Sequence, residues 1–350
     1  MSPLGDKTLV TNGNPILCRL YRGEYLESVH RGKLVLVGPD GLLESRGDIH
    51  EPVLPRSSLK PLQLLPLFAT GEPARLGLTP QEQAILVASH SGDEKHVEAV
   101  RGILAKAGVP EDALGCGASE PLDHEAMIRI YKRGEDPLRV HHNCSGKHAG
   151  FLLRAHMMGA SLEGYLDPAH PVHVEIRETL EDLTGMHLTE EDAVIDGCGA
   201  PMYSLPMETM ASLIRDIANP DRLPEKYRKA ADAIFTAVNA APHYLAGRAR
   251  IDTAILQSVP GRYFVKCGAE AYFVLGVRAC SEHPAMGLAL KVTDGASRGY
   301  ESFLARYLRE KDLLKGTEAS MAPFFDGKIK NSQGLTIGEY RTEHESPGRI

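Results

Sequence analysis

The sequence lacks the features that mark secreted, membrane-spanning and nucleic-acid-binding proteins. No apolar run approaches the roughly 20 residues that a membrane-spanning helix needs. The stretch that begins Met1-Ser2-Pro3-Leu4 has no apolar segment of the kind found in a secretory signal. Acidic residues outnumber basic ones, and the formal net charge of -7 argues against nucleic acid or an anionic membrane as the main partner. We therefore expect a cytoplasmic protein.

Cysteine is sparse and scattered. No two of the six cysteines form a Cys-x-x-Cys pair, and a chain of 350 residues with 43% apolar residues is long enough to bury a core without disulfides. In a cytosolic protein such cysteines serve more often in the core, in metal sites or as reactive thiols. They lie at Cys18, Cys116, Cys144, Cys198, Cys267 and Cys280. Internal repeats and low-complexity linkers are also missing.

The order of strands and helices predicts an α+β fold. Short β-prone runs at 15–21, 27–31 and 33–37 are separated by turn residues and indicate an antiparallel meander. Helical patterns dominate 61–249, where Thr79-Pro80-Gln81-Glu82 has the composition of a capping box. Strands return at 263–266, 271–277 and 287–292, before a last helix over about 299–314 and a strand or hairpin within 324–337.

Strands at both ends of the chain predict one antiparallel sheet flanked by helices. We expect a single catalytic domain over 1–341, with a mixed part from 10–60 and 250–340 and a mostly helical part from 61–249. The charged segment 342–350 is expected to be a frayed tail.

A serine and a lysine are spaced to meet at the start of the first expected helix. In Ser57-Ser58-Leu59-Lys60 the three-residue spacing puts Ser57 and Lys60 on one helical face. A serine hydroxyl becomes a good nucleophile when a neutral lysine amine removes its proton. The alternative is that Ser57 or Ser58 caps the helix and that Lys60 is a solvated charge.

Two later segments complete a layout typical of penicillin-recognising serine enzymes. A second hydroxyl is expected on a loop, and either Ser89 or Ser91 of Ser89-His90-Ser91-Gly92 provides it. Lys266-Cys267-Gly268 ends an expected strand, where Gly268 permits close approach of a substrate. The alternatives are a surface charge for Lys266 and an ordinary loop residue for Ser89. Together the three segments predict an acyl-transfer hydrolase.

Two further cysteines lie in glycine-rich turns. Cys144 precedes a helix in Asn143-Cys144-Ser145-Gly146-Lys147-His148, and Cys198 follows Asp196-Gly197. Thiolates suit zinc, which takes sulfur and nitrogen ligands in a tetrahedral arrangement. The alternative is a pair of buried free thiols. His141 and His142 are further candidate ligands.

At this point the sequence resembles the rhizobial-type (type 3) L-asparaginases. The resemblance runs from about Pro15 to Gly338 and rests on the segments Arg56–Gln63, Ser89–Gly92, His142–Phe151, Asp196–Gly199 and Lys266–Glu270. It implies a fold like that of serine β-lactamases, penicillin-binding proteins and glutaminases, and a homodimer. One departure is Ala271, at a position where this family often has glycine.

The resemblance also implies roles for individual residues. Ser57 would be the nucleophile with Lys60 as its base, and Ser89 with Lys266 would form a second serine–lysine pair. Zinc would be held by Cys144, Lys147 and Cys198, with Arg56, His148 and Asp196 as supports for substrate or ligands. The substrate would be L-asparagine, hydrolysed to L-aspartate and ammonia through an aspartyl ester, with the oxyanion held by the backbone N–H groups of Ser57 and Ala269.

Three alternatives remain open from the sequence. A glutaminase differs by one methylene in its substrate, which is worth about 1–3 kcal/mol of discrimination. A penicillin-type hydrolase would share Ser57, Lys60 and the Lys-x-Gly strand. A non-catalytic metal-binding or redox-sensing protein would use only Cys144 and Cys198.

Overall fold

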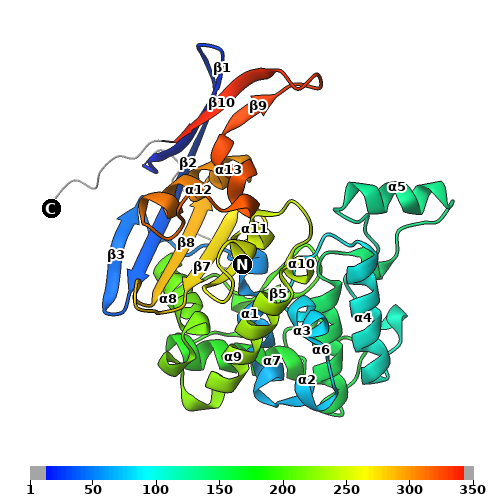
Figure 1. The fold of residues 1–350 in the computed structure, drawn as a ribbon. Helices are drawn as coiled ribbons and strands as arrows, with labels where there is room; N and C mark the ends of the chain where they lie inside the picture. The colour runs from blue at the N-terminus through cyan, green and yellow to red at the C-terminus, as the bar shows by residue number, and fades with distance from the viewer. Residues whose placement is uncertain (1–12, 343–350) are drawn as a thin grey trace, which may run out of the picture.

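Strands from both ends of the chain form one antiparallel sheet. The computed structural model of the protein describes residues 13–342. The strand order is β6-β7-β8-β2-β1-β10-β9, with β3 paired to β2 (Figure 1). The strands are β1 (Ile16–Arg22), β2 (Tyr25–Gly38), β3 (Gly41–Arg46), β6 (Tyr263–Gly268), β7 (Tyr272–Val277), β8 (Met286–Val292), β9 (Lys328–Lys330) and β10 (Thr336–Thr342). A separate two-stranded sheet holds β4 (Val194–Ile195) and β5 (Pro201–Met202).

The strand β2 links two parts of the main sheet. Its first half pairs with β1, and from Gly32 onward it pairs with β8 and β3. The part made by β1, β9 and β10 projects upward from the body in Figure 1. The runs predicted separately at 27–31 and 33–37 are therefore one strand. A Cβ at Gly32, between them, would lie 2.4 Å from the carbonyl oxygen of Lys291, so this position requires glycine.

Helices cover both faces of the sheet at β7 and β8, and every residue of these two strands is buried. The helix α8 (Met207–Ala218) packs on one face, where a Cβ at Gly276 would meet the carbonyl of Ile214. Three residues away on the strand, Phe273 contacts Tyr300 of α12 (Arg298–Glu310) with ring centroids 5.7 Å apart. An odd spacing along a strand reverses the face, so α12 lies opposite α8.

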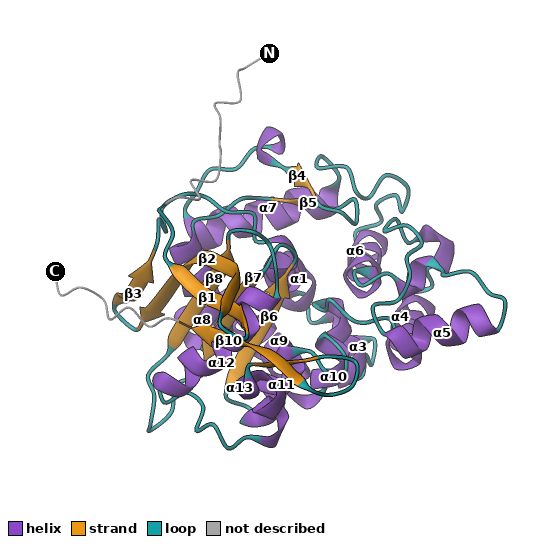
Figure 2. Ribbon diagram, turned by 90° about the horizontal axis from the view of Figure 1, so that it is seen from above, coloured by secondary structure: helices purple, strands orange, loops and turns teal. Residues whose placement is uncertain are grey.

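The middle of the chain is helical and lies beside the sheet, as Figure 2 shows from above. At its centre is α1 (Lys60–Ala69), a helix apolar on nearly all sides that packs against α6, α7 and α9. The remaining helices are α2 (Glu72–Arg75), α3 (Pro80–Leu86), α4 (Glu94–Ala107), α5 (His124–Lys132), α6 (Ser145–Met157), α7 (Pro171–Thr184), α9 (Glu225–Ala240), α10 (Pro242–Leu245), α11 (Ile251–Ser258) and α13 (Ala322–Asp326).

These elements confirm the predicted α+β class, with the sheet built from both chain ends and the helices between. The capping box is present: Thr79 Oγ1 accepts from the N–H of Glu82, and the Glu82 carboxylate accepts from the N–H of Thr79. The last long helix ends at Glu310, before the predicted 314. Thr342 ends β10, and the expected tail 343–350 lies outside the described residues. Between residues 13 and 342, no helix combines the length and apolarity needed to cross a membrane.

Candidate active site

The predicted nucleophile sits in a strained turn ahead of α1. Arg56 to Leu59 form a short 3-10 helix, η1 (Arg56–Leu59), whose N-cap is Pro55. Arg56 has φ of +50°, a left-handed conformation that costs a side-chain-bearing residue about 1–3 kcal/mol. The next residue, Ser57, is 9% exposed. Neither serine is the N-cap, so the capping alternative for Ser57 and Ser58 is wrong.

A hydrogen-bonded chain joins two buried lysines through Ser89. Lys60 Nζ lies 3.0 Å from Ser89 Oγ, and Lys266 Nζ lies 2.8 Å from the same oxygen. Each lysine is also held by a carbonyl, Lys60 by Ala88 at 2.5 Å and Lys266 by Cys267 at 2.7 Å. Both lysines are 0% exposed. They are therefore neither solvated nor surface charges, and Ser89 is the hydroxyl that bridges them.

Ser57 stands beside this chain without joining it. Lys60 Nζ donates to Ala88 and Ser89, and among residues 13–342 no hydrogen bond connects it to Ser57 Oγ. Ser58 instead binds the opposite strand, its Oγ donating to the carbonyl of Lys266 at 3.0 Å. The predicted direct Ser57–Lys60 contact is thus replaced by a Lys60–Ser89 contact. Within residues 13–342 the Ser57 hydroxyl makes no hydrogen bond, and Ser57 precedes Lys60 by three residues at the start of α1.

Ser91, the alternative second hydroxyl, points elsewhere. Its Oγ is buried without a hydrogen-bond partner among the described residues. This oxygen packs against Gly247, where an added Cβ would lie only 2.0 Å from it. The loop itself is fixed near Ser89, whose N–H donates to the carbonyl of Leu245 at 3.0 Å. The structure therefore brings Ser89, and not Ser91, to the lysines.

Gly268 lets the strand β6 approach the start of α1. A Cβ at Gly268 would lie 2.5 Å from the carbonyl oxygen of Pro55 and 3.1 Å from Ser58 Oγ. The sequence analysis predicted that Gly268 permits close approach of a substrate. In the structure, Gly268 instead permits close approach of the backbone at Pro55. A glycine is needed because it positions Lys266 against the nucleophile turn.

Burial tunes one of the lysines toward its neutral form. Desolvation lowers the pKa of Lys266 from 10.5 to about 8; Cys267 opposes this change, and the positive charge of Lys60 adds to it. A charged amine with no carboxylate partner is costly in a buried site, so Lys266 loses its proton more easily than an ordinary lysine. A base near neutrality thus lies within hydrogen-bond reach of Ser89.

Two residues that the sequence reasoning missed hold the end of β6. Asp252 is buried, and its Oδ1 accepts from the N–H of Cys267 at 2.7 Å. Arg250 Nη2 lies 3.0 Å from Cys267 Sγ. Both come from the start of α11, which has no recognisable motif. The one signal in the sequence is the pairing of a basic and an acidic residue, two positions apart, at the start of a helix.

The structure brings the three predicted zinc ligands into one buried cluster. Lys147 Nζ lies 3.2 Å from Cys198 Sγ. Cys144 lies at the N-cap of α6 and is buried, as is Cys198. A hydrogen bond from the Cys198 thiol holds the pKa of Cys144 well below its usual value, and the pKa of Cys198 is raised in turn. Two sulfurs and an amine nitrogen are donors that zinc accepts, so the residues fit the ion.

Lys147 must lose its proton before it binds a metal. Burial favours that loss, but the sulfurs of Cys198 and Cys144 and the carboxylate of Asp196 outweigh it and raise the pKa of Lys147. Binding of zinc by Lys147 would therefore release a proton that the two thiols now stabilise. The two candidate histidines are engaged elsewhere: His142 Nδ1 accepts from the N–H of Cys144 at 3.0 Å, and His141 Nδ1 from Leu138 at 2.8 Å.

Asp196 links the nucleophile turn to the thiol cluster. Its Oδ1 accepts from Arg56 Nε at 2.6 Å, and its Oδ2 lies 3.9 Å from Cys198 Sγ. His148 is buried in α6 and contacts Tyr165 instead, with Nδ1 2.5 Å from the tyrosine oxygen. Arg56 and Asp196 thus support the site directly, whereas His148 supports the packing behind it.

The turn between β6 and β7 carries the predicted oxyanion residue. Ala269 is exposed in this turn, immediately after Gly268. Ala271, where glycine was expected, has φ of +52°, and Glu270 has φ of +58°. Lys291 Nζ donates to the carbonyl of Glu270 and to that of Val292, which braces the turn. The departure at Ala271 therefore places an alanine in a conformation that favours glycine.

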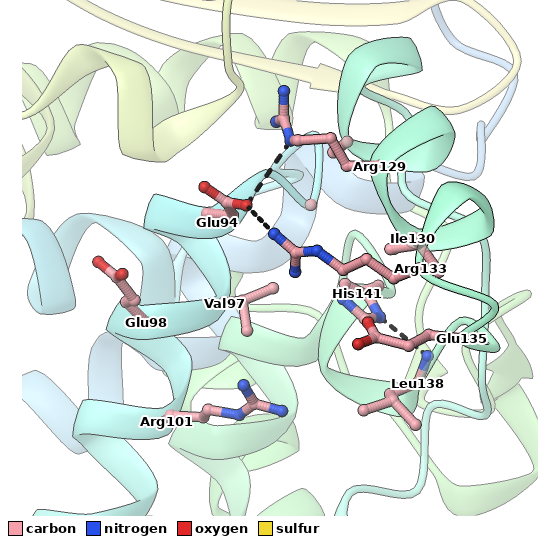
Figure 3. A pocket seen from close by; sticks show the side chains of 12 residues that line it. Glu94, Val97, Glu98, Arg101, Arg129, Ile130, Arg133, Glu135, Leu138 and His141 are labelled. Carbon is pink, nitrogen blue, oxygen red and sulfur yellow. Dashed lines mark hydrogen bonds and ion pairs between the residues drawn. The ribbon is translucent and has the colours of Figure 1, made fainter.

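A surface cavity of about 250 Å³ lies between α4 and α5, away from the lysines (Figure 3). Gly92 of the Ser89 loop and His141 are part of its wall. Glu94 projects toward Arg129 and Arg133 there, with N–O distances of 3.6 and 3.3 Å. His141, one of the further candidate ligands, is thus in its lining, whereas the predicted catalytic residues and the cysteines and lysine of the thiol cluster are not.

Solved structures with a similar arrangement include two enzymes. One is a probable glutaminase from Bacillus subtilis complexed with 6-diazo-5-oxo-L-norleucine, at 16% identity over 81% of this chain and 84% of that chain, with a TM-score of 0.38. Another is a β-lactamase from Burkholderia ambifaria, at 15% identity over 76% of this chain and 86% of that chain, with a TM-score of 0.36. At these scores the likenesses say nothing about activity. Among curated proteins, none matches the sequence.

Family membership rests on the sequence as a whole. The model of the family described as L-asparaginase II matches residues 18–342, from β1 to the end of β10. This range contains the Ser57, Ser89 and Lys266 segments and both cysteine turns. The chain therefore belongs to the L-asparaginase II family and is an amidohydrolase.

Proposed function

We propose that the protein hydrolyses L-asparagine to L-aspartate and ammonia, with Ser57 as nucleophile. The observation that carries this proposal is the chain Lys60–Ser89–Lys266, placed one helical turn from Ser57. Ser57 is 9% exposed, more than Ser58 at 0% and Ser89 at 5%. The carbon attacked would be the side-chain amide of the substrate, and the bond broken would be its C–N bond.

The lysine chain gives the proton a path. Lys266, whose pKa is lowered to about 8, starts in its neutral form and takes a proton from Ser89 Oγ. The charged Lys60 returns a proton to Ser89 and takes the Ser57 proton as the oxygen attacks, so that the net transfer is from Ser57 to Lys266. The protonated chain then gives a proton to the departing nitrogen, so that ammonia leaves and an aspartyl ester remains on Ser57. Water hydrolyses that ester with the chain acting as base again. Atoms and charge balance over the two steps.

Backbone donors and Arg56 would bind the rest of the substrate. The N–H of Ser57 and that of Ala269, on either side of the Gly268 contact, are proposed to hold the oxyanion. Arg56 is oriented by Asp196 and offers a planar guanidinium suited to a carboxylate.

We further propose that Cys144, Lys147 and Cys198 hold a zinc ion, supported by their burial and by the contact between Lys147 and Cys198. Zinc would supply a fixed positive charge and an open coordination position, which would anchor the α-carboxylate of the substrate or its α-amino group in the neutral form. The test is zinc content after dialysis. Cys198→Ser should lose the ion, whereas Cys116→Ser, another buried thiol, should keep it. Equal zinc content in both variants would contradict the site.

The activity is tested by ammonia release from L-asparagine and, separately, from L-glutamine. The expected result is release from asparagine that is faster than from glutamine and is lost in Ser57→Ala. Ser91→Ala is the matched control, since Ser91 is a buried serine that contacts neither lysine, and it should retain activity. Release by Ser57→Ala at the wild-type rate would contradict the proposal, and faster release from glutamine would make the enzyme a glutaminase.

We also propose that the chain is a cytoplasmic homodimer. Exposed apolar side chains at the projecting end of the sheet support self-association. Tyr25 and Leu26, which open β2 and pair with the end of β1, are 83% and 49% exposed, and Leu335 in the turn before β10 is 60% exposed. Sedimentation of the wild type and of Tyr25→Ser tests this, with a shift of the variant toward monomer expected. A wild-type monomer would contradict it.

A further inference from the structure

Three side chains outside the predicted machinery converge behind the Ser89 loop. Asp93 is the N-cap of α4, His96 lies one turn into the same helix, and His243 comes from α10. One ligand atom from each lies within 4.8 Å of the others. Asp93 and His96 are buried, and His243 is partly exposed. The sequence reasoning did not single out any of them.

The two carboxylate oxygens of Asp93 face one imidazole nitrogen each. Oδ1 lies 2.8 Å from His96 Nδ1, and Oδ2 lies 2.8 Å from His243 Nε2. Zinc binds histidine nitrogens and carboxylate oxygens at about 2.0–2.2 Å, which puts tetrahedral ligands roughly 3.3 Å apart. A small outward movement of the two rings would therefore make room for an ion. Two imidazoles and a carboxylate are a donor set for a first-row transition metal.

The second nitrogen of His96 supports this assignment. Nε2 lies 3.0 Å from the carbonyl oxygen of His243, to which it can only donate. A metal-binding histidine commonly donates its other N–H to such a carbonyl. In that tautomer Nδ1 is an acceptor, and it accepts from the N–H of Asp93 at 3.3 Å. Nδ1 and Asp93 Oδ1, which accepts from the N–H of His96 at 3.2 Å, are then two acceptors facing each other at 2.8 Å. A cation between them relieves the repulsion of their lone pairs, and its bond to Nδ1 replaces the 3.3 Å contact with the N–H of Asp93.

The cluster opens to solvent through a cavity of about 290 Å³, which gives an ion and a water ligand a way in. Nearby arginines are already paired with acids. Arg248 binds Asp123 and Glu125, and Arg129 lies 3.6 Å from Glu94, a contact drawn in Figure 3. The cavity is lined by Asp93, Glu94, Lys95, Glu125, Arg129, His243 and Arg248.

We propose that Asp93, His96 and His243 form a second transition-metal site, distinct from the thiol cluster, that binds a divalent ion of the Zn²⁺ type. The site joins the two segments that hold Ser89. Asp93 follows Ser89 by four residues, and two residues after His243 the carbonyl of Leu245 accepts the N–H of Ser89. A bound ion fastens these segments together and so positions the Ser89 hydroxyl; this consequence rests on the proposed function, whereas metal binding does not.

The test is metal stoichiometry in the full chain, with Co²⁺ as a spectroscopic probe and Zn²⁺ as a competitor. His243→Gln is the test variant because His243 is partly exposed. His187→Gln is the matched control, since His187 is a surface histidine paired with one acid. After chelation and reloading, wild type and His187→Gln should bind one equivalent more than His243→Gln. Thiolate-to-cobalt absorption should be the same in all three, because the proposed ligands are not thiols.

Equal stoichiometry in wild type and His243→Gln would overturn the site. The site would also be overturned if His243→Gln lost the thiolate-to-cobalt absorption together with one equivalent of metal, since the lost ion would then be one bound by the cysteines. Thermal unfolding is a second readout: Zn²⁺ should raise the melting temperature of the wild type more than that of His243→Gln. Asp93→Asn keeps a side-chain oxygen that can cap α4, and this variant should also bind one equivalent of metal less than the wild type. If ammonia release is absent while the stoichiometry differs as expected, the proposed function fails and the metal site stands.

Discussion

Ser89 Oγ lies 2.8 Å from Lys266 Nζ, although 177 residues separate the two side chains along the sequence. The same oxygen lies 3.0 Å from Lys60 Nζ, so one hydroxyl connects the helix that follows the nucleophile turn with the end of β6. In the mechanism that we propose, this bridge makes the two lysines a single proton-transfer unit. The catalytic predictions below depend on it.

Activity should depend on pH through Lys266. Because burial lowers the pKa of Lys266 to about 8, its neutral form disappears as the pH falls below that value. A base that must be neutral predicts that kcat/KM for ammonia release rises with pH, with a midpoint near 8, and falls about tenfold per pH unit well below it. Lys266→Arg should remove this activity, because arginine stays charged. The surface variant Lys229→Arg should keep it. A flat profile between pH 6 and 9 would contradict this role.

Breaking the bridge should slow the reaction more than it weakens substrate binding. Ser89→Ala separates Lys60 from Lys266, and loss of a positioned proton-transfer group typically costs 10²–10⁴-fold in rate. We expect kcat to fall by about 10² or more, with a smaller change in KM. Ser91→Ala removes a hydroxyl from the same loop that touches neither lysine and should stay near the wild-type rate. Equal losses in both variants would point to disruption of the loop instead.

Gly268 should be sensitive to a single added methyl group. In Gly268→Ala the new Cβ would meet the carbonyl oxygen of Pro55 at 2.5 Å, so the strand or the nucleophile turn must move. Overpacking of this kind costs about 1–3 kcal/mol of stability, and a displacement of the reacting groups should cut kcat at least tenfold. Urea unfolding and ammonia release measure the two effects.

The matched control is Gly261→Ala, just before β6. Gly261 has φ of +76°, so alanine is strained there, but no atom lies within 4 Å of the new Cβ. This variant should lose about 1 kcal/mol of stability and keep its activity. Full activity in Gly268→Ala would show that the contact with Pro55 does not position Lys266.

Asp252 should tune the pH profile without touching the substrate. Its negative charge raises the pKa of Lys266, against the larger opposing effect of burial. Asp252→Asn removes that charge while keeping an oxygen that can accept from the N–H of Cys267. The midpoint of kcat/KM should therefore move below the wild-type value. An unchanged or higher midpoint would contradict the electrostatic account, and circular dichroism would check that the variant is folded.

Local patterns in the sequence predicted much of the fold and the core of the site. The Thr79–Glu82 capping box and the Ser57–Lys60 spacing depend on residues three apart, so they can be recognised without knowing the fold. The last long helix begins at Arg298, one residue from its predicted start. The order of the Ser57, Ser89 and Lys266 segments matches the layout of penicillin-recognising serine enzymes. That order was enough to predict that Ser89 and Lys266 lie in the same site as Lys60.

What the sequence could not provide depends on contacts between distant segments. The two runs predicted at 27–31 and 33–37 are one long strand, in which Gly32 allows close approach to the backbone of Lys291. Asp252 matters because α11 lies under β6, and His243 because α10 lies beside α4. The direct contact expected between Ser57 and Lys60 was replaced by one with Ser89, which only the packing of the loop determines.

The most direct test of the central claim is to identify the residue that becomes acylated. A reactive diazoketone analogue of asparagine, mixed with the active enzyme and followed by peptide mapping, labels the nucleophile that attacks the amide position. The account predicts one label per chain on Ser57, protected by excess asparagine and absent from Ser57→Ala. A label on Ser89 or Cys144 instead, or an active enzyme that is never labelled, would contradict it.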